Sequence, residues 1–467
     1  MRTSSTGVFA AAILAALFLA VSACDRGAPA PVAIEGAPPP GDTSEAPSAS
    51  ASRAADAPQD AASRPAPSTG PLIVLSGHEK GFIRPCGCSK PKLGGIDKRA
   101  HALAELRRTR PDLVAVSVGD MIDEGGRQQE LKLEHFLMAL SEMRYDALVP
   151  GAGEFKIGAQ AFAERRGLAS FPVVLANARI GEEEVFTPQA PLGATGGVLI
   201  GLVAPLPPQT GVTTTPAAEA LAREIASCAE AAFVLVVYNG PEEDLSTLAE
   251  AVPEAHRAKT LFAVPGYADA PVRLAKDALG MPVVAAGAKG RALGLIRPGA
   301  AQLVDALVLE EKRPADPKAA EILASYRRAV ADEGLLTRVN RVPAPGAYAG
   351  DAACASCHRA ACDELSMSRH QRAWETLKKS GDDQDPECAK CHVTGWGLEG
   401  GFVDPASTPE RTDVDCEHCH GPSLEHVQNR TKTPGGKVDV HTCRNCHDPD
   451  NSPLFTFEAY WPKIQHR

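Results

Sequence analysis

The pattern Cys-x-x-Cys-His occurs four times in the last quarter of this 467-residue sequence, as CASCH, CAKCH, CEHCH and CRNCH. Two thiols three residues apart can add to the two vinyl groups of one haem, and the next imidazole then lies under the iron. We therefore predict four covalently bound haem c groups. The predicted thioether cysteines are Cys354, Cys357, Cys388, Cys391, Cys416, Cys419, Cys443 and Cys446, and the predicted iron ligands are His358, His392, His420 and His447.

Paired zinc sites are the alternative interpretation of these motifs. Zinc ribbons also use Cys-x-x-Cys pairs, but they do not require a histidine immediately after every pair. The four repeated histidines therefore favour haem over zinc.

The same segment is rich in further histidines, which predict second axial ligands for low-spin haems. Five lie outside the four ligand positions, against four histidines in the preceding 349 residues. His418 lies inside a motif and is poorly placed to bind another iron. The five are His370, His418, His426, His441 and His466.

Four stretches of this region resemble the tetrahaem cytochrome c-554 family: CASCHRAACDELSMSRHQRAWETL, CAKCHVTGWGLEGGF, VDCEHCHGPSLEH and FTFEAYWPKIQH. The likeness covers essentially all of residues 350–467 and implies a small, mainly α electron-transfer domain. It also implies distal ligands: His426 for the haem of His358, His370 for that of His420, and His466 for that of His447. The haem of His392 would then lack a strong sixth ligand unless His441 supplies one, and Cys362 would be a buried or free thiol.

Residues 71–312 predict an α/β domain. Short apolar runs such as DLVAVSVGD, GGVLIGLVAP and AAFVLVVYNG alternate with helical stretches such as GGIDKRAHALAELRRTRP. This alternation is typical of sheets covered by helices. Residues 313–349 predict a helical linker, with an amphipathic helix in DPKAAEILASYRRAVADEGLL followed by an extended VPAPGAYAG.

The order of blocks in the α/β domain resembles the calcineurin-like metallophosphoesterases, in the 5′-nucleotidase/UDP-sugar hydrolase branch. That family holds two metal ions with Asp-x-His, Gly-Asp, Gly-Asn-His-Glu, a lone His and Gly-His-x-His, all at strand ends. Here the matching positions read His78-Glu79-Lys80, Gly119-Asp120, Gly151-Ala152-Gly153-Glu154, Tyr238 or Asn239, and Gly266-Tyr267-Ala268-Asp269.

One clear ligand of that set, Asp120, remains. We therefore expect a sandwich of metallophosphoesterase type that is inactive. A relocated metal site built from His78, Glu79, Asp120 and Asp269 is the less favoured alternative.

Cys86 and Cys88 form a close pair beside Lys90 and Lys92. Nearby cations favour thiolate, so a metal or redox site is one interpretation. A structural pair, bonded to each other or to Cys228, is the other, and both stay open.

The N-terminus predicts export. A charged start and a short apolar run lead to Val-Ser-Ala-Cys24, which resembles a bacterial lipoprotein box. We expect a signal peptide at 1–23, lipidation of Cys24, and an Ala/Pro/Ser-rich tether at 24–70. The net charge of −10 gives no basic footprint for nucleic acid.

These features favour a lipid-anchored tetrahaem cytochrome on the periplasmic side of the cell envelope, carrying electrons between redox proteins there. One alternative is a haem enzyme that reduces or oxidises a small nitrogen species at an open haem. The other is a metal-dependent periplasmic phosphoesterase or nucleotidase fused to a redox domain.

Overall fold

The computed structural model describes residues 70–467 except 87–89, 183–184, 267, 269, 275–277, 431–437 and 467. The predicted signal peptide, Cys24 and almost all of the tether lie outside this range, as do Cys88 and Asp269 and the side chain of Cys86. The described residues belong to one compact unit. None of its helices combines the length and the apolar character needed to cross a membrane.

The first sheet has five strands in the order β15-β14-β1-β4-β5. β1 pairs with β4 in parallel and with β14 antiparallel, so Val74 lies between Ala115 and Leu295. The strands are β1 (Ile73–Ser76), β4 (Val114–Ser117), β5 (Ala147–Leu148), β14 (Ala292–Ile296) and β15 (Val304–Val308).

The second sheet has six strands in the order β12-β13-β11-β10-β8-β7, with parallel pairing in its centre. They are β7 (Gln189–Leu192), β8 (Gly197–Val203), β10 (Val234–Asn239), β11 (Thr260–Val264), β12 (Val272–Arg273) and β13 (Val283–Ala285). Two small sheets pair β2 (Pro85–Cys86) with β3 (Leu93–Gly94), and β6 (Ala178–Arg179) with β9 (Thr213–Thr214).

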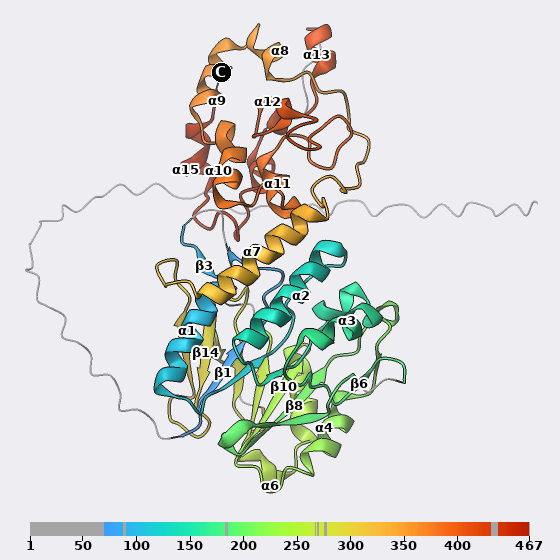
Figure 1. Ribbon diagram of the computed structural model, residues 1–467, viewed down its shortest axis with the longest axis vertical. Helices are drawn as coiled ribbons and strands as arrows, with labels where there is room; N and C mark the ends of the chain where they lie inside the picture. Colours follow the sequence, from blue (N-terminus) through green and yellow to red (C-terminus); the bar gives the residue numbers. More distant parts are fainter. Residues whose placement is uncertain are drawn as a thin grey trace, which may run out of the picture. The chain divides into compact units, whose positions relative to one another are not determined.

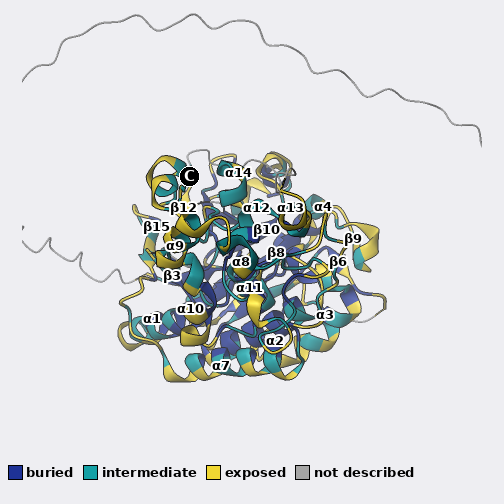
Figure 2. Ribbon diagram, turned by 90° about the horizontal axis from the view of Figure 1, so that it is seen from above, coloured by how far each residue is buried: buried dark blue, intermediate teal, exposed yellow. Residues whose placement is uncertain are grey.

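The main core lies between the two large sheets. Val116 of β4 and Val237 of β10 are fully buried and belong to the same apolar cluster. Val236, the neighbour of Val237, belongs to a second cluster, which also contains residues of α4 and α5. Successive strand residues point to opposite faces, so β10 contributes to both layers. Figure 2 shows the buried residues in dark blue within the body that holds β8 and β10. This α/β sandwich, followed by a small and mainly helical body, is the fold class expected from the sequence.

Three helices, α1 (Ile96–Thr109), α2 (Arg127–Glu142) and α7 (Pro317–Asp332), lie side by side and bury apolar residues in the core of the sandwich (Figure 1). The other helices are α3 (Ala159–Arg165), α4 (Ala217–Ile225), α5 (Leu245–Glu250) and α6 (Glu254–Arg257), with 3-10 turns η1 (Gly153–Ile157), η2 (Arg166–Leu168), η3 (Gly193–Thr195), η4 (Pro208–Thr210) and η5 (Glu242–Asp244).

Helix α7 is the amphipathic helix expected between the two bodies, but it packs on α1 and α2. Asp316 caps its first turn by accepting the N–H groups of Lys318 and Ala319, both at 3.0 Å. Leu323 and Tyr326 are buried in the core of the sandwich. The helix is therefore part of the α/β body as well as the connection to the C-terminal body.

The C-terminal body consists of short helices around one small apolar cluster. That cluster contains Leu336, Trp374, Leu377, Ala389, Val393 and Phe402. The helices are α8 (Asp351–Ala355), α9 (Arg359–Met367), α10 (Ala373–Ser380), α11 (Pro386–His392), α12 (Cys416–His420), α13 (Leu424–Gln428), α14 (Val440–Arg444) and α15 (Phe457–Tyr460), with η6 (His370–Arg372), η7 (Pro409–Arg411) and η8 (Trp461–Lys463). This cluster is much smaller than the two apolar clusters of the α/β body.

Candidate functional site

Each Cys-x-x-Cys-His motif forms a single helical turn. In the first motif the His358 N–H donates to the carbonyl of Cys354 at 2.9 Å, and in the fourth the His447 N–H donates to that of Cys443 at 2.8 Å. The second and third motifs lie within α11 and α12. A helical turn brings residues three and four apart onto one face, which places both thiols and the imidazole of a motif on the same side.

All eight motif cysteines are free thiols, and so are Cys362 and the buried Cys228. The open interpretation in which Cys228 bonds to Cys86 or Cys88 is therefore wrong. Thioether bonds need unpaired thiols, so the residues present fit covalent haem attachment at all four motifs.

Three of the four motif histidines face a second imidazole. The ring centres are 6.0 Å apart for His358 and His426, 6.1 Å for His370 and His447, and 5.8 Å for His420 and His466. An iron bound by two imidazole nitrogens, each at about 2 Å, holds the ring centres about 6 Å apart. The three distal histidines therefore fit axial ligation.

Two of the three expected pairings are wrong. The family resemblance assigned His370 to the haem of His420 and His466 to that of His447, but the structure exchanges the two. Only the pairing of His426 with His358 lies as expected. The exchange comes from the way distant segments pack, because neither distal histidine is close in sequence to the motif it faces.

His392 differs from the other three. Its Nδ1–H donates to the carbonyl of Ala373 at 2.6 Å, which leaves Nε2 as the atom able to bind a metal. No second imidazole ring is stacked opposite His392 in the described part of the chain. His441, the expected substitute, is exposed on α14.

Both ring nitrogens of His418 contact neighbouring protein groups, in agreement with the expectation that a histidine inside a motif is poorly placed to bind another iron. Its Nδ1–H donates to the carbonyl of Val393 at 3.0 Å, and its Nε2 lies 3.6 Å from the sulfur of Cys446.

Burial lowers the pKa of His418 and also those of His392, His420 and His447. Burial likewise lowers the pKa of His370 to about 4. Neutral imidazole is the form that binds metal, so these environments favour ligation.

Motifs far apart in sequence are neighbours in space. The sulfur of Cys391 lies 4.0 Å from the carbonyl oxygen of Asn445 in the fourth motif. The free thiol of Cys354 in the first motif is hydrogen-bonded to that of Cys416 in the third. The second motif therefore adjoins the fourth, and the first adjoins the third.

In the loop expected to be a lost metal site, the carboxyl groups of Glu154 and Asp120 accept hydrogen bonds from the backbone. Glu154 is fully buried and accepts the backbone N–H groups of Asp120 (2.9 Å), Met121 (2.6 Å) and Gly151 (2.8 Å). Asp120 in turn accepts the N–H of Gly153 at 2.8 Å. A Cβ on Gly151 would lie 2.3 Å from the carboxylate of Asp120, so any larger residue there would displace that carboxylate.

Glu79, another residue of the proposed relocated site, is also engaged. The Oε1 of Glu79 lies 2.5 Å from Nη1 of Arg99, and both side chains are buried. Lys80 pairs with Asp123 at 3.2 Å. His78, Lys80 and Asp120 all have positive φ angles, between 49° and 55°, a conformation that side chains rarely adopt. Within the described ranges, no three His, Cys, Asp or Glu side chains are grouped to hold a metal ion.

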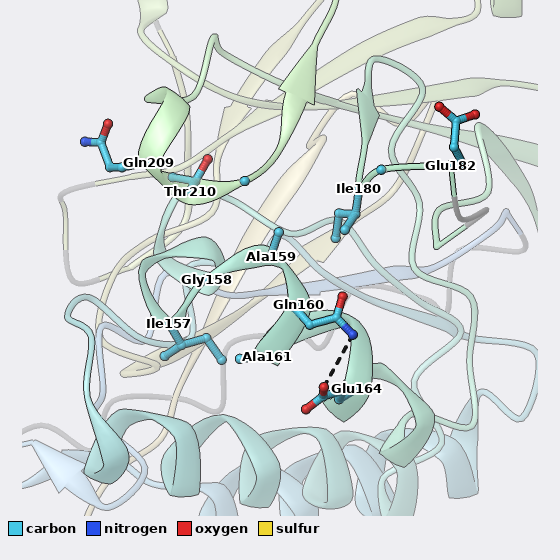
Figure 3. Close-up of a pocket in the computed structure, with 12 residues that line it drawn as sticks. Ile157, Gly158, Ala159, Gln160, Ala161, Glu164, Ile180, Glu182, Gln209 and Thr210 are labelled. Carbon is cyan, nitrogen blue, oxygen red and sulfur yellow. Dashed lines mark hydrogen bonds between the residues drawn. The ribbon is translucent and has the colours of Figure 1, made fainter. Parts of the chain in front are cut away.

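Figure 3 shows a hollow of about 820 Å³ on the α/β body, between η1, α3 and the segment around η4. Its walls combine glycine and alanine residues with polar side chains, and Gln160 donates a hydrogen bond to Glu164 at 3.3 Å within it. None of the residues that the sequence singled out lines this hollow.

Comparisons with known proteins now bear on the C-terminal body. Residues 353–421 match the family model described as cytochrome c554 and c-prime. This chain is also 34% identical over 102 residues to cytochrome c-554 of Nitrosomonas europaea, a match that covers 19% of this chain and 43% of that protein. The chain thus spans less than half the length of this relative. The expected resemblance is confirmed, and this family implies covalently bound haem c.

Solved structures that match this chain include two phosphoesterase-type proteins, which resemble its α/β body. A 5′-nucleotidase precursor from Thermus thermophilus is 18% identical, with a TM-score of 0.47, and the match covers 67% of this chain and 68% of that one. A calcineurin-like phosphoesterase from Bacillus subtilis is 15% identical, with a TM-score of 0.44, over 56% of this chain and 98% of that one.

Proposed function

We propose that this protein is a lipid-anchored tetrahaem c-type cytochrome that transfers electrons between redox proteins at the periplasmic side of the cell envelope. The observation that carries the proposal is the set of four one-turn motifs with free thiols, three of which have an imidazole facing the motif histidine. Two-imidazole ligation is typical of haems that carry electrons without binding substrate. The adjoining motifs favour short distances between neighbouring haems.

The haem count is tested on native protein by a pyridine haemochrome assay and intact mass. We expect four haems per chain, and three in a variant with both Cys388→Ala and Cys391→Ala. Fewer than four in the wild type, or zinc without covalently attached porphyrin, would contradict the proposal.

The anchor is tested by cell fractionation. The sequence at Cys24 supports lipidation, so the wild-type protein should sediment with membranes and the Cys24→Ala variant should not. Equal distribution of the two proteins would argue against a lipid anchor.

A second function is favoured by the surroundings of His392. Without a facing imidazole, its haem would keep an open position able to bind a small nitrogen species such as nitric oxide or hydroxylamine. A high-spin ferric signal in the resting protein, shifted by adding either compound, would support this function. A uniformly low-spin spectrum that becomes partly high-spin in His441→Ala would instead assign His441 as the sixth ligand.

A further inference from the structure

The α/β body contacts the second haem motif directly through Arg84. This side chain lies on the loop that follows β1 and is 20% exposed. Its Nη1 lies 2.6 Å from Asp382 and its Nη2 lies 2.9 Å from Asp385. Nη2 also donates to the sulfur of Cys388 at 3.0 Å. That sulfur is the atom that would form a thioether with haem, and a thioether sulfur remains a weak acceptor.

Side chains of helix α2 contact the first turn of α11, the helix that carries the same motif. Gln128 donates to Asp385 at 2.7 Å, and Gln129 donates to Glu387 at 2.8 Å. The ammonium group of Lys132, only 3% exposed, lies 2.5 Å from Glu387. A buried lysine is costly unless it is paired, so this ion pair fixes the position of Glu387 relative to α2.

Helix α7 and the segment after it complete the contact. Arg327 lies 2.9 Å from Asp382, and Tyr326 lies 3.5 Å from Asp385. Leu336, just beyond α7, packs in the apolar cluster that contains Ala389 of α11. The haem-binding helix therefore has polar contacts at its first turn and apolar contacts along one side.

These contacts act on a short, rigid element. Asp385 is the N-cap of α11 and accepts the N–H of Glu387 at 2.9 Å. The seven residues of α11 include both cysteines and the histidine of the second motif. Fixing the first turn of such a helix also fixes the sulfur and imidazole positions further along it.

A second contact joins the α/β body to the fourth motif. Lys289, in the loop between β13 and β14, pairs with Asp450, three residues after His447. Arg291 lies 3.4 Å from the same carboxylate. Because the second and fourth motifs adjoin, the α/β body contacts one end of the haem array at two places. Loops after parallel strands are where α/β folds usually bind ligands, and here such loops hold the haem body.

We infer that the α/β body is a built-in part of the haem site at Cys388, Cys391 and His392, with Arg84 and Lys132 as positioning residues that also set the reduction potential of this haem. The inference rests on the proposed function. Charge near a haem and the groups around its ligands are established determinants of its potential. Reduction adds an electron, so a fixed cation favours the reduced state.

The test is a spectroelectrochemical titration of purified holoprotein variants, with haem content measured on the same samples. Arg84→Gln should retain four haems and lower the midpoint potential of one of them. We expect about a tenfold change in its reduction equilibrium constant, which corresponds to about 59 mV. Arg84→Lys, which keeps the charge, should give a smaller shift. Lys132→Met should shift the same haem in the same direction.

The matched control is Arg328→Gln, which removes an equal charge from an exposed pair with Glu321 on α7. It should leave all four midpoints unchanged. Midpoints in Arg84→Gln equal to those of this control would overturn the inference. If Arg84→Gln fails to fold, Arg84→Lys and Lys132→Met decide: unchanged midpoints in both would overturn it, and a shift confined to one haem would support it.

The outcome is separable from the proposed function. A wild-type protein without covalent haem would end the proposed function before any potential is measured. A wild-type protein with four haems whose potentials do not respond to Arg84 or Lys132 would leave the cytochrome intact and remove only the role of the α/β body.

Discussion

Glu154 explains how the loop at residues 151–154 keeps its conformation. This loop lacks the asparagine and histidine that the calcineurin-like family has at the matching positions. The two carboxyl oxygens of Glu154 accept three backbone N–H groups from two separate turns. Buried N–H groups left without acceptors are costly, and a single carboxyl group that accepts three of them stabilises both turns. The N–H groups of His78 and Lys80, residues that also have positive φ angles, donate to the carbonyls of Gly119 (2.6 Å) and Asp120 (3.0 Å) on the same turn.

The Glu154 carboxyl predicts a pH effect on stability. Burial, and then the nearby Asp120 carboxylate, raise the pKa of Glu154 from its ordinary 4.5 to about 8. The stability that the protonated form provides is present below pH 4.5 and is lost as the pH rises through 8. Asp120→Asn keeps an oxygen for the Gly153 N–H but removes the charge, so it should reduce this loss.

The measurement is the free energy of unfolding in urea at several pH values between about 4.5 and 8.5, the window set by the two pKa values. Glu321→Gln, which changes an exposed acid on α7 by the same charge, is the control and should keep the wild-type slope. An identical slope in Asp120→Asn would count against the coupling of the two carboxyls.

The buried pair of Arg99 and Glu79 gives a second residue-level prediction. Arg99→Met leaves the Glu79 carboxylate buried without its cation, which should cost about 3–5 kcal/mol of unfolding free energy. The double variant with Glu79→Met removes both charges and should recover most of that loss. Denaturant unfolding monitored by far-UV circular dichroism measures both values, and a double variant as unstable as the single one would refute the argument.

At the scale of elements, α11 and α7 begin in the same way, with an aspartate N-cap followed by proline. Asp385 accepts one N–H of its helix and Asp316 accepts two. Capping alone therefore predicts that Asp316→Ala costs at least as much as Asp385→Ala, about 1 kcal/mol for each. Only Asp385 also pairs with Arg84 across the two bodies.

We therefore expect Asp385→Ala to be clearly more destabilising than Asp316→Ala. It should also lower the haem content or change the visible spectrum, whereas Asp316→Ala should leave both unchanged. Unfolding free energies and pyridine haemochrome values of the two purified variants measure this difference. Equal effects of the two substitutions would show that the cap, and not the contact between bodies, is what matters at Asp385.

The short elements η6 and α14 each carry one histidine, and the two histidines differ in their surroundings. His370 faces His447 with its ring centre 6.1 Å away, whereas His441 is exposed. His370→Ala should create one new high-spin haem, and His370→Met should keep that haem low-spin at a higher potential, because Met as an axial ligand raises the potential. His441→Ala should leave the electron paramagnetic resonance spectrum unchanged, and a new high-spin signal in His441→Ala alone would reverse the assignment.

At the scale of the whole molecule, the ion pairs of Arg84, Lys132, Arg327 and Lys289 predict that the two bodies unfold together. The Soret band reports on the haem body, and far-UV circular dichroism is dominated by the larger α/β body. The two transitions in guanidinium chloride should coincide for the wild type. They should separate in a variant that combines Arg84→Gln with Lys132→Met, and separate transitions in the wild type would contradict a single cooperative unit.

Much of this architecture could be predicted from the sequence. The runs at β4, β8 and β10 and the helices α1 and α7 follow from the sequence because their apolar pattern is strong. The apolar run FPVVLANA forms only isolated bridges at Val173 and Val174, before β6 begins at Ala178. β14 and β15, which complete the first sheet, were not predicted. Short strands are specified by the partners they find in the sheet, and a single sequence does not contain that information.

The haem motifs are the part of this protein that the sequence determined by itself. Their chemistry depends on two thiols and an imidazole within one helical turn, and this spacing is fixed by covalent geometry. Tertiary structure alone decided which imidazole faces each motif histidine, the contact between motifs two and four, and the docking of α11 on Arg84 and Lys132. Each of these joins residues that are distant in the sequence, and only the packing of the folded chain determines which of them meet.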